Sequence, residues 1–309
     1  MTLRAALLTF RIHRFETILV IGATVVSALV SAAVIGWMSS SGFTTCLSED
    51  GPPTFSSLCQ GSLGLWVSRI ARLSVTIVPV FPFVAGLLLG GPLVARELEG
   101  GTARLAWSLG PSRLRWFVQR AVPALALIVV AALVIGFTSD ALFRTMHPTI
   151  NFDQSFIGFR GRGLLVAVEA LLIASTAVAL GSILGRLVPT FILTLILAAG
   201  IGIAVEKVEN ELLMSEAVVS DNFRWDGTDM YLTSRFRLAE GPIVTWEEML
   251  ALHPEYEMQG PPENVANVVL YIPGSRYHDV ELREALGLAG LAGIFLAVAG
   301  VAVTRRRPR

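Results

Sequence analysis

The sequence has almost no lysine. Of its 24 basic residues only Lys207 is a lysine, and the other 23 are arginines. An ATP-binding loop of the form G-x-x-x-x-G-K-[ST] needs a lysine that reaches the terminal phosphates. Lys207 lies in a segment that the charge pattern places outside the cell, so the sequence excludes a nucleotide site of this kind.

Charged residues are also scarce. They make up 16% of the 309 residues, whereas 53% are hydrophobic, and the mean hydropathy is +0.65. A soluble domain carries about a quarter charged residues. The histidines are scattered, no G-x-S-x-G elbow is present, and no histidine lies near a cysteine. We therefore expect an integral membrane protein with no catalytic residues, metal or cofactor of its own, and no nucleic-acid partner.

There are two cysteines, Cys46 and Cys59, in the hydrophilic segment that follows the first apolar run. In an oxidising compartment they would pair, and we favour a disulfide. Two free thiols on a loop are the alternative, because Gly51, Pro52 and Pro53 lie between them. The absence of Cys-x-x-Cys spacing argues against redox chemistry.

Six apolar runs are long enough to cross a hydrocarbon core of about 30 Å as helices. The first run carries no cleavage pattern, so we expect it to remain as a helix rather than to be removed as a signal peptide. The sequence thus predicts an all-α membrane protein. The runs are Ile18–Trp37, Ile70–Val94, Ala121–Ser139, Gly163–Leu184, Val188–Val205 and Ala285–Val303.

The arginines predict the orientation, because cytoplasmic loops retain positive charge. They cluster before the first run, between the second and third, between the fourth and fifth, and after the sixth, whereas residues 206–284 are acid-rich. Both termini are therefore predicted to be cytoplasmic and both cysteines external. We divide the chain into spans 1–205, an external cap 206–284, and a last span with a basic tail 285–309. Residues Leu3 to Phe15 suit either an interfacial helix or an extension of the first span.

The connection between the second and third spans, Arg96 to Arg120, is the most informative stretch; it reads RELEGGTARLAWSLGPSRLRWFVQR. Gly100 and Gly101 interrupt the descending helix, and Thr102 can cap a short helix that follows. Gly110 and Pro111 end it, and Ser112 can cap the next. The pattern predicts a short helix held across the membrane surface, at about residues 97–113.

These residues resemble the signature of ABC-2 type permeases, especially the actinobacterial branch. The match runs from Arg96 through Thr102 and includes Trp107-Ser108 and Arg113-x-Arg115-Trp116. A second match is Tyr271 to Tyr277, YIPGSRY, before the sixth span. Ser108 and Leu109 stand where that branch usually has Thr and Gln.

The resemblance implies a permease subunit of an exporter in the bacterial plasma membrane. It would dimerise, bind two copies of a separate ATPase that uses ATP and Mg, and move an amphipathic or apolar substrate, such as a lipid, peptide or drug. The short helix would be the coupling helix. The coupling residues would be Arg96, Glu97, Glu99, Gly101, Thr102, Arg104, Trp107 and Arg113.

Three residues within the spans are further candidates. Glu169 could line a pathway, pair with Arg69 or Arg72, or reach water at the interface. Pro79 and Pro82 must distort the second span and are candidate hinges. Two other functions stay open: an ion-coupled secondary carrier with Glu169 as the coupling site, and a membrane sensor or scaffold whose external segment binds a ligand.

Overall fold

The computed structural model describes residues 10–46, 61–109, 112–224, 227–237, 243–252, 254 and 265–306. Contacts divide the chain into two compact units. The first contains residues 1–149, 160–202 and 282–309, and the second contains residues 150–159 and 203–281. Each unit is described by itself below.

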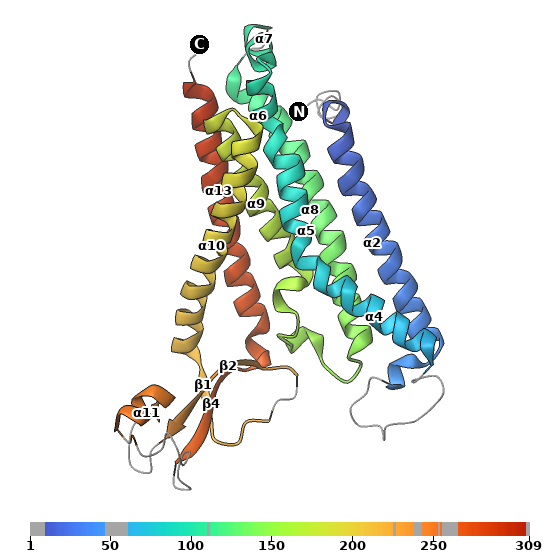
Figure 1. Cartoon of the computed structure of the whole chain (residues 1–309), viewed down its shortest axis with the longest axis vertical. Helices are drawn as coiled ribbons and strands as arrows, with labels where there is room; N and C mark the ends of the chain where they lie inside the picture. Colours follow the sequence, from blue (N-terminus) through green and yellow to red (C-terminus); the bar gives the residue numbers. More distant parts are fainter. Residues whose placement is uncertain are drawn as a thin grey trace. The chain divides into compact units, whose positions relative to one another are not determined.

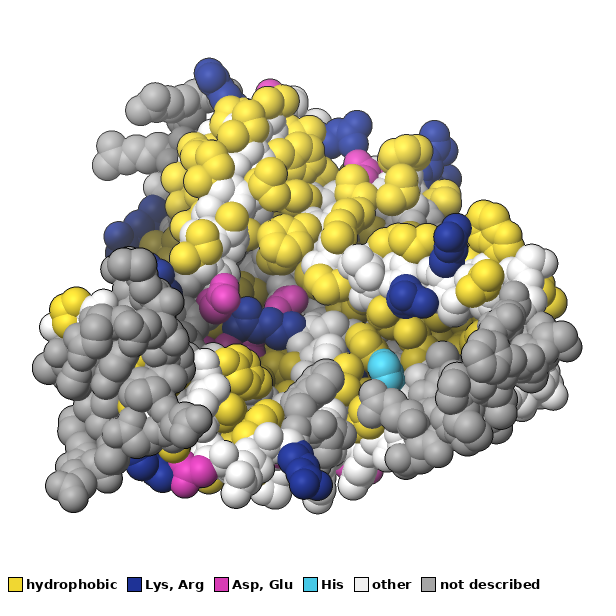
Figure 2. Space-filling model, turned by 60° about the horizontal axis from the view of Figure 1, so that its bottom comes forward, with side chains coloured by type: hydrophobic (Ala, Val, Ile, Leu, Met, Phe, Trp, Pro, Cys, Tyr) yellow, Lys and Arg dark blue, Asp and Glu magenta, His cyan; other side chains and the backbone are white. Residues whose placement is uncertain are grey.

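Among the described residues, six helical stretches are long and apolar enough to cross a membrane, which confirms the predicted number and order of spans. They run over Arg14–Ser40, Ser62–Glu99, Arg113–Met146, Gly163–Leu184, Leu187–Glu216 and Gly274–Arg305. Large hydrophobic side chains stay exposed along most of them, and Figure 2 shows broad areas of hydrophobic side chains on the face that it draws. Such surfaces suit contact with lipid.

The first unit is a helical bundle (Figure 1). It contains α2 (Arg14–Ser40), the short η1 (Phe43–Cys46), the broken second span, α8 (Arg113–Met146), α9 (Gly163–Leu184), and parts of α10 (Leu187–Glu216) and α13 (Tyr277–Arg305). Residues 10–12 are helical and His13 forms a turn before α2. The rest of the predicted interfacial helix lies outside the described residues, as does Cys59, so the disulfide stays a prediction.

The second span is not one regular helix. It consists of α4 (Ser62–Ile77), a 3-10 turn η2 (Val78–Val80), α5 (Phe81–Ala85), a π-helical turn η3 (Gly86–Gly90) and α6 (Gly91–Glu99). Pro79 and Pro82 lie in the first turns of η2 and α5. A proline removes a backbone donor and crowds the preceding turn, which explains the breaks. The predicted distortion is confirmed, and a hinge role stays a prediction.

Small residues bring α9 into the centre of the bundle. A Cβ atom added at Gly90 would lie 2.8 Å from the Ala174 carbonyl oxygen, and one at Gly86 would lie 2.9 Å from the Ala174 nitrogen. On the other side, a Cβ at Gly136 of α8 would lie 2.3 Å from the Gly163 carbonyl oxygen. These backbones approach closely because no side chain intervenes, as in other membrane helix pairs.

The second unit carries a sheet that the sequence reading did not predict. Its described strands are β1 (Val218–Ser220), β2 (Met230–Arg237), β3 (Ile243–Val244) and β4 (Ala266–Ile272), all antiparallel in the order β1-β4-β2-β3. Helix α11 (Trp246–Leu252) follows β3. It begins with a capping box, in which Glu248 accepts from the Thr245 nitrogen at 2.8 Å and the Thr245 hydroxyl accepts from the Glu248 nitrogen at 3.2 Å.

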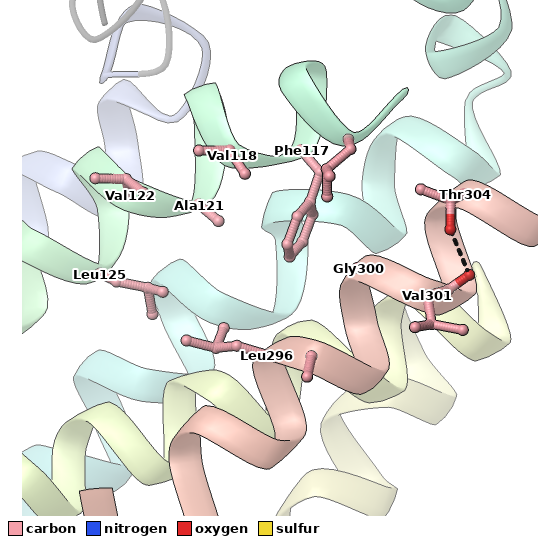
Figure 3. A pocket seen from close by; sticks show the side chains of 11 residues that line it. Phe117, Val118, Ala121, Val122, Leu125, Leu296, Gly300, Val301 and Thr304 are labelled. Carbon is pink, nitrogen blue, oxygen red and sulfur yellow. Dashed lines mark hydrogen bonds between the residues drawn. The ribbon is translucent and has the colours of Figure 1, made fainter. Parts of the chain in front are cut away.

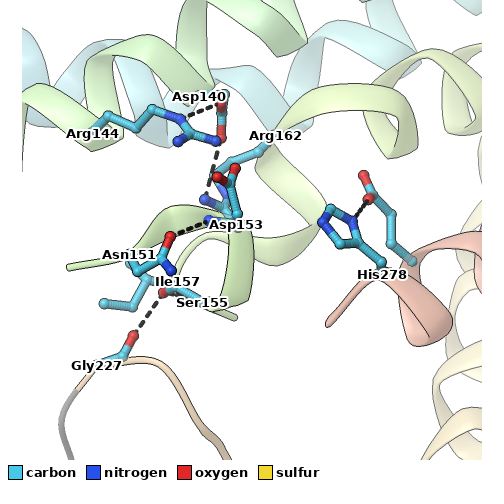
Figure 4. A network of polar contacts seen from close by, with 10 residues as sticks. Asp140, Arg144, Asn151, Asp153, Ser155, Ile157, Arg162, Gly227 and His278 are labelled. Atoms are coloured by element: carbon cyan, nitrogen blue, oxygen red, sulfur yellow. Dashed lines mark hydrogen bonds and ion pairs between the residues drawn. The ribbon is translucent and has the colours of Figure 1, made fainter. Parts of the chain in front are cut away.

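Residues 150–159, with η4 (Phe152–Gln154), also belong to the second unit. The Ser155 hydroxyl donates to the Gly227 carbonyl at 2.7 Å (Figure 4), and the Phe156 nitrogen donates to the Thr228 carbonyl at 3.0 Å. The Phe156 ring also packs edge-on against Tyr277, with centroids 5.5 Å apart. A segment between the third and fourth spans therefore completes the unit that residues 203–281 form.

Candidate functional site

The candidate site is the short helix α7 (Thr102–Leu109), at the end of the bundle where α2 begins and α13 ends (Figure 1). Gly100 ends α6, and Gly101 has a φ of +72°, a conformation that L side chains rarely adopt. The Thr102 hydroxyl donates to the Glu97 carbonyl at 3.3 Å. Gly101 thus lies at the start of α7 as predicted. Thr102 is the first residue of α7, and its described contact is this bond back to α6 rather than the predicted cap. Gly110 and Pro111 lie outside the described residues.

The helix that follows α7 in the chain, α8, begins with a capped first turn. Ser112 has extended backbone angles, and its hydroxyl accepts from the Arg115 nitrogen at 3.2 Å at the beginning of α8. This is the geometry of an N-cap, and it confirms the predicted role of Ser112. Together, Gly101 and Ser112 fix α7 between two spans.

A stack of side chains holds α7 against α8. The Arg113 guanidinium lies 4.9 Å from the Trp107 ring centre, and Trp107 meets Trp116 edge to face with centroids 5.7 Å apart. Arg120 lies 5.1 Å from the Trp116 ring centre and donates to the Glu97 carboxylate. Cation–π and edge-to-face contacts are each attractive. The stack makes α7, α8 and α6 one connected body.

The predicted coupling charges find partners within the chain. Arg96 pairs with Glu16 of α2 at 3.2 Å, and Glu97, only 7% exposed, pairs with Arg120. The Glu99 carboxylate accepts from the Leu187 nitrogen at 2.9 Å, at the first residue of α10. That nitrogen has no acceptor within its own helix, and a carboxylate suits the positive end of a helix dipole.

Arg113 makes the corresponding contact with α13. It donates to the carbonyls of Thr304 and Arg306, at the end of that helix. Arg306 in turn donates to the Ser182 carbonyl of α9 at 2.7 Å, and it lies over Gly185, where a Cβ would be 2.4 Å from Nη2. Arginine donors satisfy carbonyls that a helix end leaves open. The α7 region is therefore tied to α2, α8, α10 and α13.

The outer face of α7 is exposed, unlike the inner side that contacts the other helices. Thr102, Leu105 and Ser108 lie three residues apart, so they share one side of the helix, and all three are exposed. Leu105 is 65% exposed. Arg104 lies on α7, and its side chain is outside the described part. Among the described side chains, the outer face of α7 is uncharged with an exposed leucine at its centre.

His13 immediately precedes α2, close to the Arg96 and Arg120 side chains of the α7 region. Burial lowers the pKa of its imidazole; the Glu16 carboxylate raises it, and the positive charges of Arg120 and Arg96 lower it further. The net result is a lowered pKa, so a neutral ring is favoured near neutral pH.

The other candidates lie away from α7. Glu169 is on α9, about two turns from the opposite end, and the charge acting on it is Arg160 rather than Arg69 or Arg72. Arg160 also pairs with Glu284 of α13 at 3.0 Å. The Arg69 guanidinium instead lies 5.7 Å from the centre of the Trp66 ring, three residues earlier on α4. Helix α4 packs on α2 and α8.

A further polar cluster was missed by sequence reasoning. Arg162, 1% exposed, lies 3.2 Å from one oxygen of Asp140, and Arg144 donates to the other at 2.8 Å (Figure 4). Asp140 and Arg144 are four residues apart on α8, which is a signal for a helical pair, but nothing in the sequence indicates Arg162. Among the described residues, no group of three side chains could hold a metal ion.

A family model described as ABC-2 membrane transporter related matches residues 17–209. The chain belongs to this family. The match covers most of the first and fifth spans, and it includes the whole of α6, α7 and α8. Searches of curated proteins and of solved structures gave no match. As an ABC-2 family member with six apolar helices, the chain is a multi-pass membrane subunit, and the family implies an ABC ATPase as its partner.

Proposed function

We propose that the chain is the permease subunit of an ABC exporter, and that α7 is the helix on which a separately encoded ATPase acts. The observation that carries this proposal is the two-sided character of the α7 region. Its exposed side offers Leu105 between two small polar residues, and its inner side is tied to four other helices. A displacement of α7 would therefore be transmitted to most helices of the bundle.

The exposed face suits a partner with an apolar pocket. An exposed leucine flanked by Thr102 and Ser108 can be buried without leaving a charge unpaired. We assign Arg96, Glu97, Glu99 and Arg113 to the inner connection, because each contacts another helix of the same chain. Trp107 belongs to the stack that fixes the angle of α7.

The remaining parts of the proposal rest on the family and on charge. We propose a dimer with two copies of the ATPase, in a bacterial plasma membrane, with both termini and α7 on the cytoplasmic side. The arginines at this end of the bundle support that orientation. The second unit would then be external, and the substrate would be an amphipathic or apolar molecule.

The test is co-purification in detergent with an ABC ATPase encoded beside the permease. We expect a stable complex with the wild type and its loss in Leu105→Asp, because a carboxylate would be buried without a partner. Val218→Asp, which places the same charge on the exposed β1, is the matched control and keeps the complex. A complex that survives Leu105→Asp overturns the role of α7. Transport that continues without any ATPase would favour an ion-coupled carrier.

A further inference from the structure

An apolar groove of about 460 Å³ lies between the first part of α8 and the last part of α13 (Figure 3). These parts lie at the end of the bundle that carries α7 (Figure 1). Phe117 and Leu125 line it from α8, and Leu296, Gly300 and Val301 line it from α13. Among the described residues that line it, Thr304 carries the one hydroxyl, which donates to the Val301 carbonyl at 3.0 Å. The groove therefore offers a ligand almost no polar partner along its length.

Two arginines extend the rows of side chains that line the groove. Arg115 precedes the lining residues Val118 and Val122 by three and seven positions, so it lies on the same stripe of α8. Arg305 follows Val301 by four positions on α13 in the same way. Both arginines are exposed. The apolar groove thus ends at two exposed positive charges, and none of the described residues that line it is a carboxylate.

A ligand matching these features has a long apolar part joined to an anionic head. We propose that the groove binds an anionic phospholipid from the leaflet at this end of the bundle. One acyl chain would lie between α8 and α13, and the phosphate would contact Arg115 and Arg305. Basic sites between transmembrane helices are suited to such head groups, since a guanidinium binds phosphate through two parallel hydrogen bonds.

The charges also argue against a second copy of the chain as the occupant. A two-fold interface joins the same patch on both subunits, so it would bring Arg115 and Arg305 of one copy toward the same arginines of the other. Because the described lining of the groove contains no carboxylate, like charges would face each other there. An anionic lipid neutralises them instead. This inference does not depend on the proposed transport function.

The experiment is native mass spectrometry of the full chain released from detergent with added phosphatidylglycerol or with phosphatidylcholine of the same acyl chains. We expect tighter binding of phosphatidylglycerol to the wild type. Because each arginine near a lipid surface contributes modestly, Arg115→Gln and Arg305→Gln should each weaken it about fivefold, and the double variant about 25-fold. The matched control is Arg186→Gln, which removes an exposed arginine at the same end of the bundle and leaves the affinity unchanged.

A second variant tests the apolar half of the site. Val301→Trp fills the groove and should weaken both lipids while the arginines remain. Equal binding of the two lipids, or an equal loss in Arg186→Gln, would overturn the proposal in favour of general surface attraction. A dimer that falls apart in Val301→Trp, with lipid binding intact, would show that a second copy occupies the groove. The arginine variants alter exposed side chains, so they decide the matter even if Val301→Trp does not fold.

Discussion

Replacing Arg120 by glutamine removes the partner of a buried carboxylate. Glu97 is almost fully enclosed, and Arg120 both donates to it and covers the Trp116 ring. In Arg120→Gln the carboxylate loses its counter-charge, and the stack that supports α7 loses one end. In Glu97→Gln, by contrast, the amide oxygen still accepts from the guanidinium.

The two changes should therefore differ in size. Breaking a buried ion pair by removing one partner costs about 3 kcal/mol or more, because it leaves a charge that is neither paired nor hydrated. We expect about this loss for Arg120→Gln. For Glu97→Gln we expect roughly 1 to 2 kcal/mol, the difference between a charged and a neutral hydrogen bond. A loss of 1 kcal/mol lowers the melting temperature of a 150–250-residue domain by about 2 to 4 °C.

The assay is thermal unfolding in one detergent at one heating rate, for the wild type, both single variants and the double variant. Arg120→Gln should melt roughly 6 to 12 °C lower than the wild type. The double variant should recover part of this loss, since glutamine at position 97 no longer buries a charge. If the two losses simply add, to within about 0.5 kcal/mol, Arg120 and Glu97 do not stabilise each other, contrary to this prediction.

Three further predictions concern packing and ionisation. Gly136→Ala should lower the melting temperature, because its Cβ would meet backbone, whereas Gly36→Ala, which meets nothing within 4 Å, should not. Because burial lowers the pKa of His13, protonation favours the unfolded chain; the melting temperature should fall as pH drops below about 6.5, and less so in His13→Gln. Hydrogen bonds from the Thr245 backbone and then from its side chain lower the pKa of Glu248, so amide protection in α11 should decline as pH falls below the ordinary pKa of glutamate and be lost once pH falls through the lowered pKa. Thr245→Ala keeps the backbone donor but removes the hydroxyl that accepts from the Glu248 nitrogen, so amide protection in α11 should already be weaker at neutral pH.

The sequence was sufficient for features that depend on neighbouring residues or on the membrane. Six spans were predictable because each must satisfy its own backbone over the bilayer thickness. The start of α7 at Gly101 and the cap at Ser112 were predictable for the same local reason, since each is decided within four residues. The break in the second span was likewise predictable from Pro79.

The partners of the charges could not be predicted in this way. Arg96 meets Glu16 across 80 positions, Glu99 meets Leu187 across 88, and Arg113 meets Arg306 across 193. Nothing in the local pattern around these residues specifies such contacts, because they follow from how whole helices pack. The same holds for the four strands and for residues 150–159, whose place in the second unit depends on pairing between distant segments.

The most direct test of the proposed role of α7 is to identify what contacts this helix in the assembled transporter. A photo-reactive phenylalanine analogue placed at Leu105 reports on the exposed face of α7, and the same analogue at Val219 reports on β1 of the second unit. We expect a covalent adduct with the co-expressed ABC ATPase from position 105 and none from position 219. An adduct from position 219, or none from position 105 in an active transporter, would contradict the proposed role of α7.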